Sequence, residues 1–591
     1  MKARLGIALL SGAVLLAPAV GHATWSVDPV TVHATTDECP LVAAASDAQD
    51  GAIVVWQQDD AANPGVFRLL AKRLLANGDV DAAWPVAGAI VSTATVNRSA
   101  LGALGDGNSG AYVWWMENAS LYLTRILSNG TIAAGWAARG KPLGYLPLST
   151  FRPLVFADGQ GGIWLGWLAG APLYTAGRIT HLGPAGQGAG GWPDGARQYA
   201  VSSQEEEGLQ TLAFTYAPAP DGGAWIAWGD AMYDADGYHA GSWRLLRTTT
   251  TGVPGPGWDV SGLPVRDFHG ELLVGAWCLY SPSEPPYFAA SPVALASDGA
   301  DGVYLLLSDV TGVAEWAQST PRLFHLDATG AAVPSWPAGG VVPYASGSGE
   351  GVDPGANCSL RLFAEVAGGV FALRPSYFSE GYIDLTLARF TPAATRTEWS
   401  GAEPNGLECI VPPSGETYLA TCSPFGVQGS YSPGAYIHLE ETHASGAAGP
   451  GFTEYHDLPS VRWYGDVGLA PTSGAGAILA WSQVRERQGV FARRFTAAGE
   501  VTGVPPGGPA TQVLRLRFAP GLGVVATLGR VAGGRIQLHD VAGRVCAGTE
   551  VPVGAGEVTV EGTATLAPGL YFVRHRGADG ATETARVVVI R

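Results

Sequence analysis

Acidic residues recur where apolar, strand-like segments end, at Asp59, Glu117, Asp230 and Asp309. Two carboxylates held about 5–9 Å apart would permit glycoside hydrolysis. The acids recur in several copies of one pattern, however, whereas catalysis needs an asymmetric constellation. Their recurrence therefore favours a role in hairpins, and we assign no catalytic residue.

Metal and cofactor motifs are weak in this sequence. His438 and His443 lie five residues apart in a strand-like segment, whereas the zinc-protease motif needs two histidines four apart on a helix. Asp234-Ala235-Asp236-Gly237 lacks the further oxygen ligands of an EF-hand loop, which favours a turn. The run Glu205–Glu207 is interpreted as a solvated loop. We expect no metal and no cofactor, and the absence of GxSxG, P-loop and GxGxxG motifs makes an enzyme less probable.

One pattern recurs eight times along the chain. An apolar segment ends in a charged or polar residue, and a glycine follows five positions later, with Ala394 in the glycine place of the sixth copy. Another apolar segment precedes each copy, and it begins after a glycine turn. In the first copy this preceding segment runs into Trp56. A tryptophan often comes after the second glycine, as at Trp84. The copies begin at Arg73, Arg125, Arg178, Arg247, His325, Arg389, Glu441 and Arg494.

This repeat predicts the fold class. Copies spaced by roughly 50 to 80 residues, each with several short strands, are typical of propeller blades. We predict an all-β protein with an eight-bladed β-propeller over residues 24–508, in which the segment 25–45 supplies a closing strand. Seven blades with one divergent copy, or a string of β-sandwich domains, are the alternatives. Residues 265–298 break the period and are expected to be a loop insertion between the fourth and fifth blades.

The N-terminus and the net charge indicate an exported protein. Residues 1–23 form a predicted signal peptide, with Lys2 and Arg4 before the apolar run Leu5–Val20 and a small-x-small site at Gly21-His22-Ala23. No later segment is apolar enough to span a bilayer, so we expect no transmembrane segment after signal removal. The net charge of −17 argues against nucleic acid as a partner. Six cysteines without a CxxC pair fit disulfides better than zinc.

The last 80 residues differ in pattern from the repeats and follow a Pro/Gly-rich linker that begins at Pro505. Three blocks stand out: residues 536–545 with a D-x-x-G-R turn, 566–574 with L-x-x-G-x-Y-x-V, and 585–591 with V-V-V and a final arginine. Residues 512–591 resemble the type A sorting domain of the type IX secretion system, an immunoglobulin-like β-sandwich. The usual N-P opening is reduced to Ala519-Pro520, and a hook-cap type immunoglobulin-like module is the alternative. The motif residues are Asp540, Gly543, Arg544, Gly569, Tyr571 and Arg591.

The resemblance implies recognition by the type IX secretion machinery and passage through the periplasm of a Gram-negative-type envelope. We therefore expect a secreted or outer-surface protein. The leading hypothesis is a non-enzymatic binding protein whose propeller presents a polysaccharide- or protein-binding face. The alternatives are a polymer-degrading hydrolase or lyase with acids at the propeller mouth, and a structural array with no small ligand.

Overall fold

A computed structural model describes most of the chain and divides it into two compact units. The large unit is Trp25–Thr502, and the C-terminal unit contains Gly503–Arg591. The described residues are 29–145, 153–171, 174–201, 210–233, 239–270, 293–312, 318–343, 361–364, 368–377, 383–402, 406–410, 417–425, 434–442, 452–454, 468–472, 476–483, 489–496, 515–519, 523–527, 532–539, 545–553, 557–561, 563, 569–577 and 582–589. The predicted signal peptide and the glycine place of the eighth copy lie outside them.

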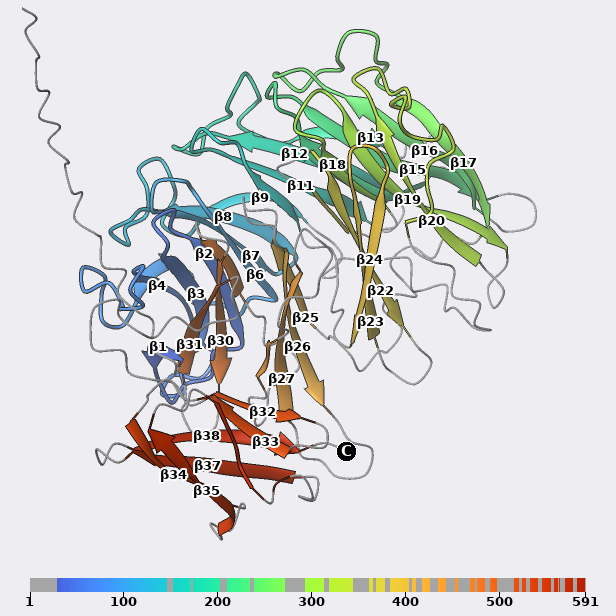
Figure 1. Ribbon diagram of the computed structural model, residues 1–591. Helices are drawn as coiled ribbons and strands as arrows, with labels where there is room; N and C mark the ends of the chain where they lie inside the picture. Colours follow the sequence, from blue (N-terminus) through green and yellow to red (C-terminus); the bar gives the residue numbers. More distant parts are fainter. Residues whose placement is uncertain are drawn as a thin grey trace, which may run out of the picture. The chain divides into compact units, whose positions relative to one another are not determined.

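The large unit is built from short antiparallel sheets in chain order (Figure 1). In most of these sheets four successive strands pair in chain order, each antiparallel to the next. The first three sheets are β2(Leu41–Ser46)–β3(Ala52–Asp59)–β4(Phe67–Leu74)–β5(Ala89–Ser92), β6(Ala100–Gly105)–β7(Ala111–Glu117)–β8(Ser120–Ile126)–β9(Lys141–Tyr145), and β10(Leu154–Ala157)–β11(Ile163–Ala171)–β12(Tyr174–Leu182)–β13(Arg197–Val201).

The middle of the large unit holds one longer sheet. Its first part is β14(Gln210–Pro218)–β15(Ala224–Tyr233)–β16(His239–Arg247)–β17(Leu263–Gly270), and its second part is β18(Val293–Ser297)–β19(Val303–Gly312)–β20(Gln318–Leu326). A short parallel pairing joins them, with His269 opposite Thr311 and Gly270 opposite Gly312. The expected insertion at 265–298 is therefore too wide, since both of its ends belong to strands and only 271–292 lie outside the described residues.

Three further four-stranded sheets complete the described large unit. They are β21(Arg361–Ala364)–β22(Val370–Tyr377)–β23(Ile383–Phe390)–β24(Arg396–Ala402), β25(Gly406–Ile410)–β26(Thr417–Phe425)–β27(Gly434–Thr442)–β28(Phe452–Glu454), and β29(Gly468–Thr472)–β30(Gly476–Gln483)–β31(Gly489–Thr496)–β1(Val30–Ala34). The last sheet combines the two ends of the unit, because β1 pairs with β31. The prediction that the segment 25–45 supplies a closing strand is confirmed.

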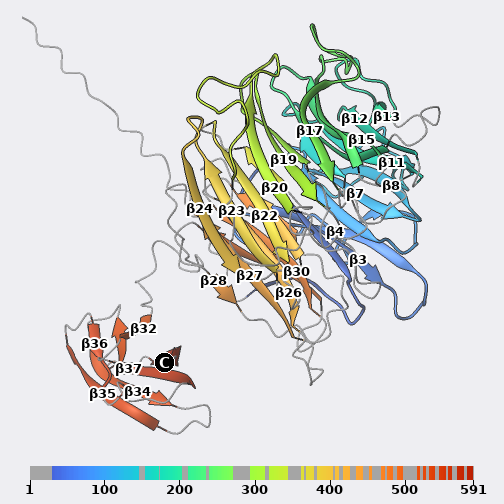
Figure 2. The ribbon, with the colours of Figure 1, turned by 90° about the vertical axis from the view of Figure 1, so that its right-hand side faces the viewer.

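The sheets of the large unit pack face to face around a circle (Figures 1 and 2). The first strand β2 contacts both β6 of the following sheet and β29 of the last one. The same kind of contact joins β6 to β10, β10 to β14, β14 to β18, β18 to β21 and β25 to β29. This arrangement is propeller-like, as the repeat predicts.

The core lies between consecutive sheets. Trp56 of β3, for example, is fully buried with Ile478 of β30 in one cluster, and Trp115 of β7 is buried with Val55 of β3 in the next. Fully burying a large apolar side chain contributes about 1.5–3 kcal/mol, so each interface stabilises both of its sheets. No single sheet contains the core, which explains why the apolar segments read as nearly continuous.

The C-terminal unit contains two antiparallel sheets. One is β32(Arg515–Ala519)–β33(Gly523–Thr527)–β36(Glu557–Thr559), and the other is β35(Val545–Val553)–β34(Ala532–His539)–β37(Gly569–Gly577)–β38(Thr582–Val589). Both sheets bury apolar residues, including Val524 and Ala526 in the first and Ile536, Leu538 and Val573 in the second. In the described part of the chain, no helix has the length and apolar character needed to cross a lipid bilayer.

Candidate functional site

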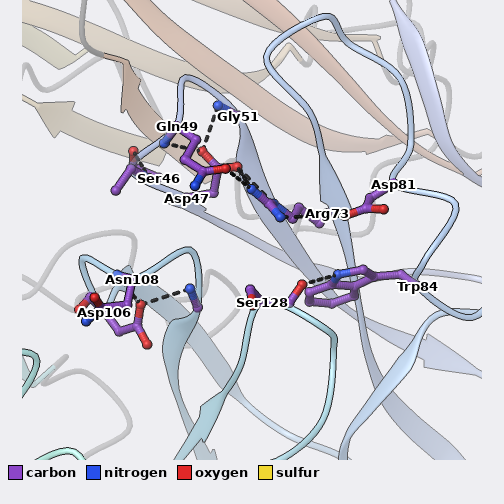
Figure 3. Close-up of polar contacts among 12 residues, drawn as sticks. Ser46, Asp47, Gln49, Gly51, Arg73, Asp81, Trp84, Asp106, Asn108 and Ser128 are labelled. Atoms are coloured by element: carbon purple, nitrogen blue, oxygen red, sulfur yellow. Dashed lines mark hydrogen bonds and ion pairs between the residues drawn. The ribbon is translucent and has the colours of Figure 1, made fainter.

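An aspartate-centred turn recurs between the first and second strands of the sheets. In the first copy, Asp47 Oδ1 accepts the backbone N–H of Gln49 at 2.8 Å and that of Gly51 at 2.7 Å (Figure 3). Its Oδ2 accepts two hydrogen bonds from Arg73, at 2.9 and 2.8 Å. Turns of the same geometry centre on Asp106, Asp158 and Asp298. We call these four the aspartate turns.

Close packing requires the glycine that ends each aspartate turn. A Cβ at Gly51 would lie 2.2 Å from the carbonyl oxygen of Leu74 and 2.6 Å from Asp47 Oδ2. Gly110 and Gly162 have the same two close neighbours in their own copies. The residue at this place must therefore lack a side chain.

The fourth sheet keeps this arrangement with a different acid. Ala219 occupies the aspartate place and retains the backbone bond to Gly223 O at 3.0 Å. Asp221, two residues later, supplies the carboxylate instead and pairs with Arg247 at 2.7 Å. The cation is thus matched by an acid even where the turn sequence changes.

The partner of each turn is an arginine or a histidine from the third strand of the same sheet. Arg125 pairs with Asp106 at 2.6 Å, and His325 pairs with Asp298 at 3.0 Å. In the third copy the partner of Asp158 is His181, at 3.1 Å, with Gly186 in the left-handed turn position. The sequence assignment of Arg178 and Gly183 to that copy was wrong by three residues, because Arg178 satisfied the charge pattern by coincidence.

Aromatic rings cover several of these arginine and histidine partners. The Arg247 guanidinium lies 5.1 Å from the ring centroid of Trp225, and Arg125 lies 5.7 Å from that of Tyr112. The two histidine copies stack instead, His181 on Trp164 at 4.0 Å and His325 on Tyr304. Each pair is largely excluded from water, which strengthens it.

In several copies the tryptophan after the hairpin donates a hydrogen bond to the neighbouring sheet. Trp84 Nε1 donates to the carbonyl of Ser128 in the next sheet at 2.7 Å (Figure 3), and Trp136 donates to Pro184 at 2.9 Å. Trp336 donates in the same way to Pro392. In the sixth copy Ala394 has φ of 60°, so it occupies the left-handed place that glycine holds elsewhere, as the sequence indicated. The recurring tryptophans and glycines are therefore structural.

A polar cluster that does not recur lies at the opposite end of the strands, between the first and second sheets. Glu117, at the end of β7, is 2% exposed, forms an ion pair with Arg139 and has a buried Oε2 without a hydrogen-bond partner among the described residues. Arg98 is 3% exposed, and its Nε is likewise without such a partner. Burial lowers the pKa of the Arg98 guanidinium to about 10, opposed by Glu117. Trp115 lies under Arg98 at 5.6 Å. We call Glu117, Arg98, Arg139 and Trp115 the Glu117 cluster.

Backbone contacts hold the Glu117 cluster in place. Arg98 donates to the carbonyls of Val96 at 2.9 Å and Ala94 at 2.8 Å, which fixes the connection between the two sheets. Gln57 of the first sheet accepts the Arg98 N–H at 3.0 Å. Two arginines beside one carboxylate compensate its charge, so the cluster suits hydrogen bonding to a polar ligand better than proton donation.

The other predicted acids do not join Glu117. Asp230 pairs with Arg244 of its own sheet at 3.2 Å. Asp309 lies on β19 opposite Thr320, in a different sheet. Counted from the turn glycine, Asp59 lies one residue beyond the place shared by Glu117, Asp230 and Asp309, and Gln58 holds that place in the first copy. The acids thus belong to separate sheets.

The predicted sorting motif falls on one sheet of the C-terminal unit. Gly569 and Tyr571 lie on β37, opposite Val589 and Val587 of β38. The three blocks that carry the resemblance include parts of the adjacent strands β34, β37 and β38. Asp540, Gly543, Arg544 and Arg591 lie outside the described residues.

The weaker sequence motifs add no site. His438 lies on the strand β27, as expected, while His443, Asp234–Gly237 and Glu205–Glu207 lie outside the described residues. Within the described part of the chain, no group of three or more His, Cys, Asp or Glu residues is placed to hold a metal ion.

The sheets and turns define an all-β protein whose large unit is propeller-like. No family model matches the chain, and no curated protein matches it. Among solved structures, it is similar to the polysaccharide lyase Uly1, with 7% identity and a TM-score of 0.39 over 72% of this chain and 93% of the lyase.

Two other solved structures are also similar, again at low sequence identity. A eukaryotic initiation factor has 10% identity and a TM-score of 0.36, over 81% of this chain and 89% of that one. The α-L-arabinanase of Penicillium chrysogenum, complexed with arabinobiose, has 9% identity and a TM-score of 0.28, over 66% and 90%. Likenesses at this level assign no activity to this chain.

Proposed function

We propose that this protein is a secreted or cell-surface binding protein without catalytic activity, exported through a type IX secretion system. Its large unit would be an eight-bladed β-propeller, in which the longer middle sheet counts as two blades. Its C-terminal unit would be an immunoglobulin-like sandwich that acts as the sorting domain.

The binding role rests on a difference between the aspartate turns and the Glu117 cluster. The aspartate turns use their carboxylates for backbone N–H groups and for a cation of the same sheet, so these acids are structural. The Glu117 cluster does not recur, and it contains a buried acceptor and a buried donor without hydrogen-bond partners among the described residues. Both atoms are buried, so a ligand would meet the cluster at Arg139, whose side chain is 56% exposed and can donate to a ligand hydroxyl.

A polysaccharide fits this cluster better than an apolar ligand does. The described acids at the strand ends lie in separate sheets, and Glu117 and Asp230 each have an arginine partner. Glycoside hydrolysis needs two cooperating carboxylates, and these ion pairs compensate the charge of both acids. The alternative, a secreted hydrolase or lyase of polymers, would require a second acid beside the Glu117 cluster.

Binding can be tested with the mature chain and two matched variants. Arg139→Gln removes an arginine that is 56% exposed and pairs with Glu117, and Arg68→Gln removes one that is 55% exposed and pairs with Asp60. Pull-down on a panel of insoluble polysaccharides should show retention that is lost in Arg139→Gln and kept in Arg68→Gln. If every polysaccharide that retains the parent chain also retains both variants equally, the ligand site lies elsewhere.

Export can be tested separately. The full chain and a version ending at Pro509 are expressed in a host with a type IX system, and the medium, surface and periplasmic fractions are blotted. We expect the full chain outside the outer membrane and the shortened chain in the periplasm. Retention of both versions in the periplasm would contradict the sorting role.

A further inference from the structure

The four-stranded sheet of the C-terminal unit gathers arginine positions on one face. Arg535 on β34 lies directly opposite Arg576 on β37. Arg574 lies two residues before Arg576, and Arg586 on β38 lies opposite position 572 of β37. Residues two apart on a strand share a face, and so do residues directly opposite each other. These four positions therefore share one face, which we call the arginine face.

The arginine face is the side of the sheet away from the buried residues. Ile536 and Leu538 alternate with Arg535 along β34 and are fully buried. Arg535 itself is 62% exposed on its side chain. Glu550 is the acid placed on the same face among the described residues of the sheet, and its contact with Arg535 is long, at 3.5 Å, and exposed. This face therefore holds four arginine positions and, among the described residues of the sheet, one acid.

The composition of the C-terminal unit contrasts with that of the whole chain. Residues 503–591 contain nine arginines, no lysine and six acidic residues, whereas the chain has 34 basic and 51 acidic residues. Arginine is the usual basic residue throughout the chain, which has 31 arginines and three lysines. Its planar guanidinium can bind a carboxylate through two parallel hydrogen bonds.

Directly opposed arginines also disfavour the sheet, because like charges repel across a strand pair. An acidic counterpart that binds the face would offset this repulsion. The arginine positions are roughly 5 Å apart across strands and 7 Å apart along β37. A linear polymer with repeated charges can therefore contact several of them at once. We propose that the arginine face binds an anionic polysaccharide through its carboxylate groups. This proposal does not depend on the sorting role.

The test uses the full chain, polygalacturonate as the probe and uncharged dextran as its control. Arg535→Gln combined with Arg576→Gln removes two charges from the arginine face, and Arg515→Gln combined with Arg517→Gln removes two from β32 of the other sheet. We expect the first pair to weaken polygalacturonate binding about tenfold or more, and the second pair to change it by less than about twofold. Binding should also weaken as salt is added.

Three results would overturn the proposal. One is an equal loss of binding in both double variants, and another is equally tight binding of a double-stranded DNA oligonucleotide, which would indicate a general affinity for polyanions. The third is a loss of thermal stability in Arg576→Gln, which would indicate that this arginine is structural. The proposal expects the opposite, an unchanged or higher Tm, because the variant relieves a like-charge pair.

Discussion

The aspartate turn makes a quantitative prediction about stability. In Asp106→Ala the backbone N–H groups of Asn108 and Gly110 lose their acceptor, and Arg125 loses its partner. The side chains of Asp106 and Arg125 are 1% and 11% exposed, so water replaces these contacts poorly. Removing one partner of a buried ion pair costs about 3–5 kcal/mol. We expect a loss of that size in the free energy of unfolding.

The measurement is urea unfolding followed by tryptophan fluorescence and circular dichroism. Asp79→Ala is the matched control, because Asp79 is exposed on a hairpin and its loss should cost less than about 0.5 kcal/mol. Asp106→Asn keeps an oxygen for the N–H groups but removes the charge, so its loss should lie between the two. If Asp106→Ala and Asp79→Ala differ by less than about 1 kcal/mol, a difference too small for a buried ion pair, the structural role given to these turns is wrong.

Three further variants test other parts of the account. Gly110→Ala places a Cβ 2.5 Å from a carbonyl oxygen and should lower the midpoint of urea unfolding more than Gly195→Ala, whose Cβ meets no atom within 4 Å and whose φ is not left-handed. Ala394→Gly should stabilise the fold by about 0.5–1 kcal/mol in the same assay, because φ of 60° suits glycine; a loss of stability would contradict this. Burial, with the charge of Lys72 as a second cause, lowers the pKa of His33 below 6.5, so the unfolded chain takes up the proton first as the pH falls. The His33 contribution to stability should therefore be intact above pH 6.5 and lost as the pH falls through the folded pKa. The Tm of His33→Gln should depend less on pH than the Tm of the parent chain. The same pH dependence in both chains would refute this.

The strand pattern could be predicted from the sequence because apolar segments, glycine turns and tryptophans recur at fixed offsets. The left-handed place of Ala394 and the closing strand near residue 30 were both found in this way. The roles of the recurring residues were harder to predict. Asp47 lies four residues before the turn glycine, Gly51, and its partner Arg73 is 26 residues away.

The Glu117 cluster was only partly visible in the sequence. Glu117 was noted for its recurrence, yet its surroundings come from Arg98 in a connection and Arg139 in a hairpin. Neither arginine belongs to the repeat, so only the packing of two sheets brings them together. The missed signal was the difference between the copies, since Glu117 alone among these acids directly precedes an Asn-Ala turn, which has positive φ at both residues.

Binding without turnover is the central claim, and one experiment measures both. The mature full chain is incubated with each polysaccharide that retains it, and the same samples are assayed for bound protein and for newly released reducing ends or unsaturated products. The account predicts saturable retention with no product above that of heat-denatured protein. Product that accumulates in proportion to time and protein, and that disappears in Glu117→Gln, would contradict it and establish an enzyme.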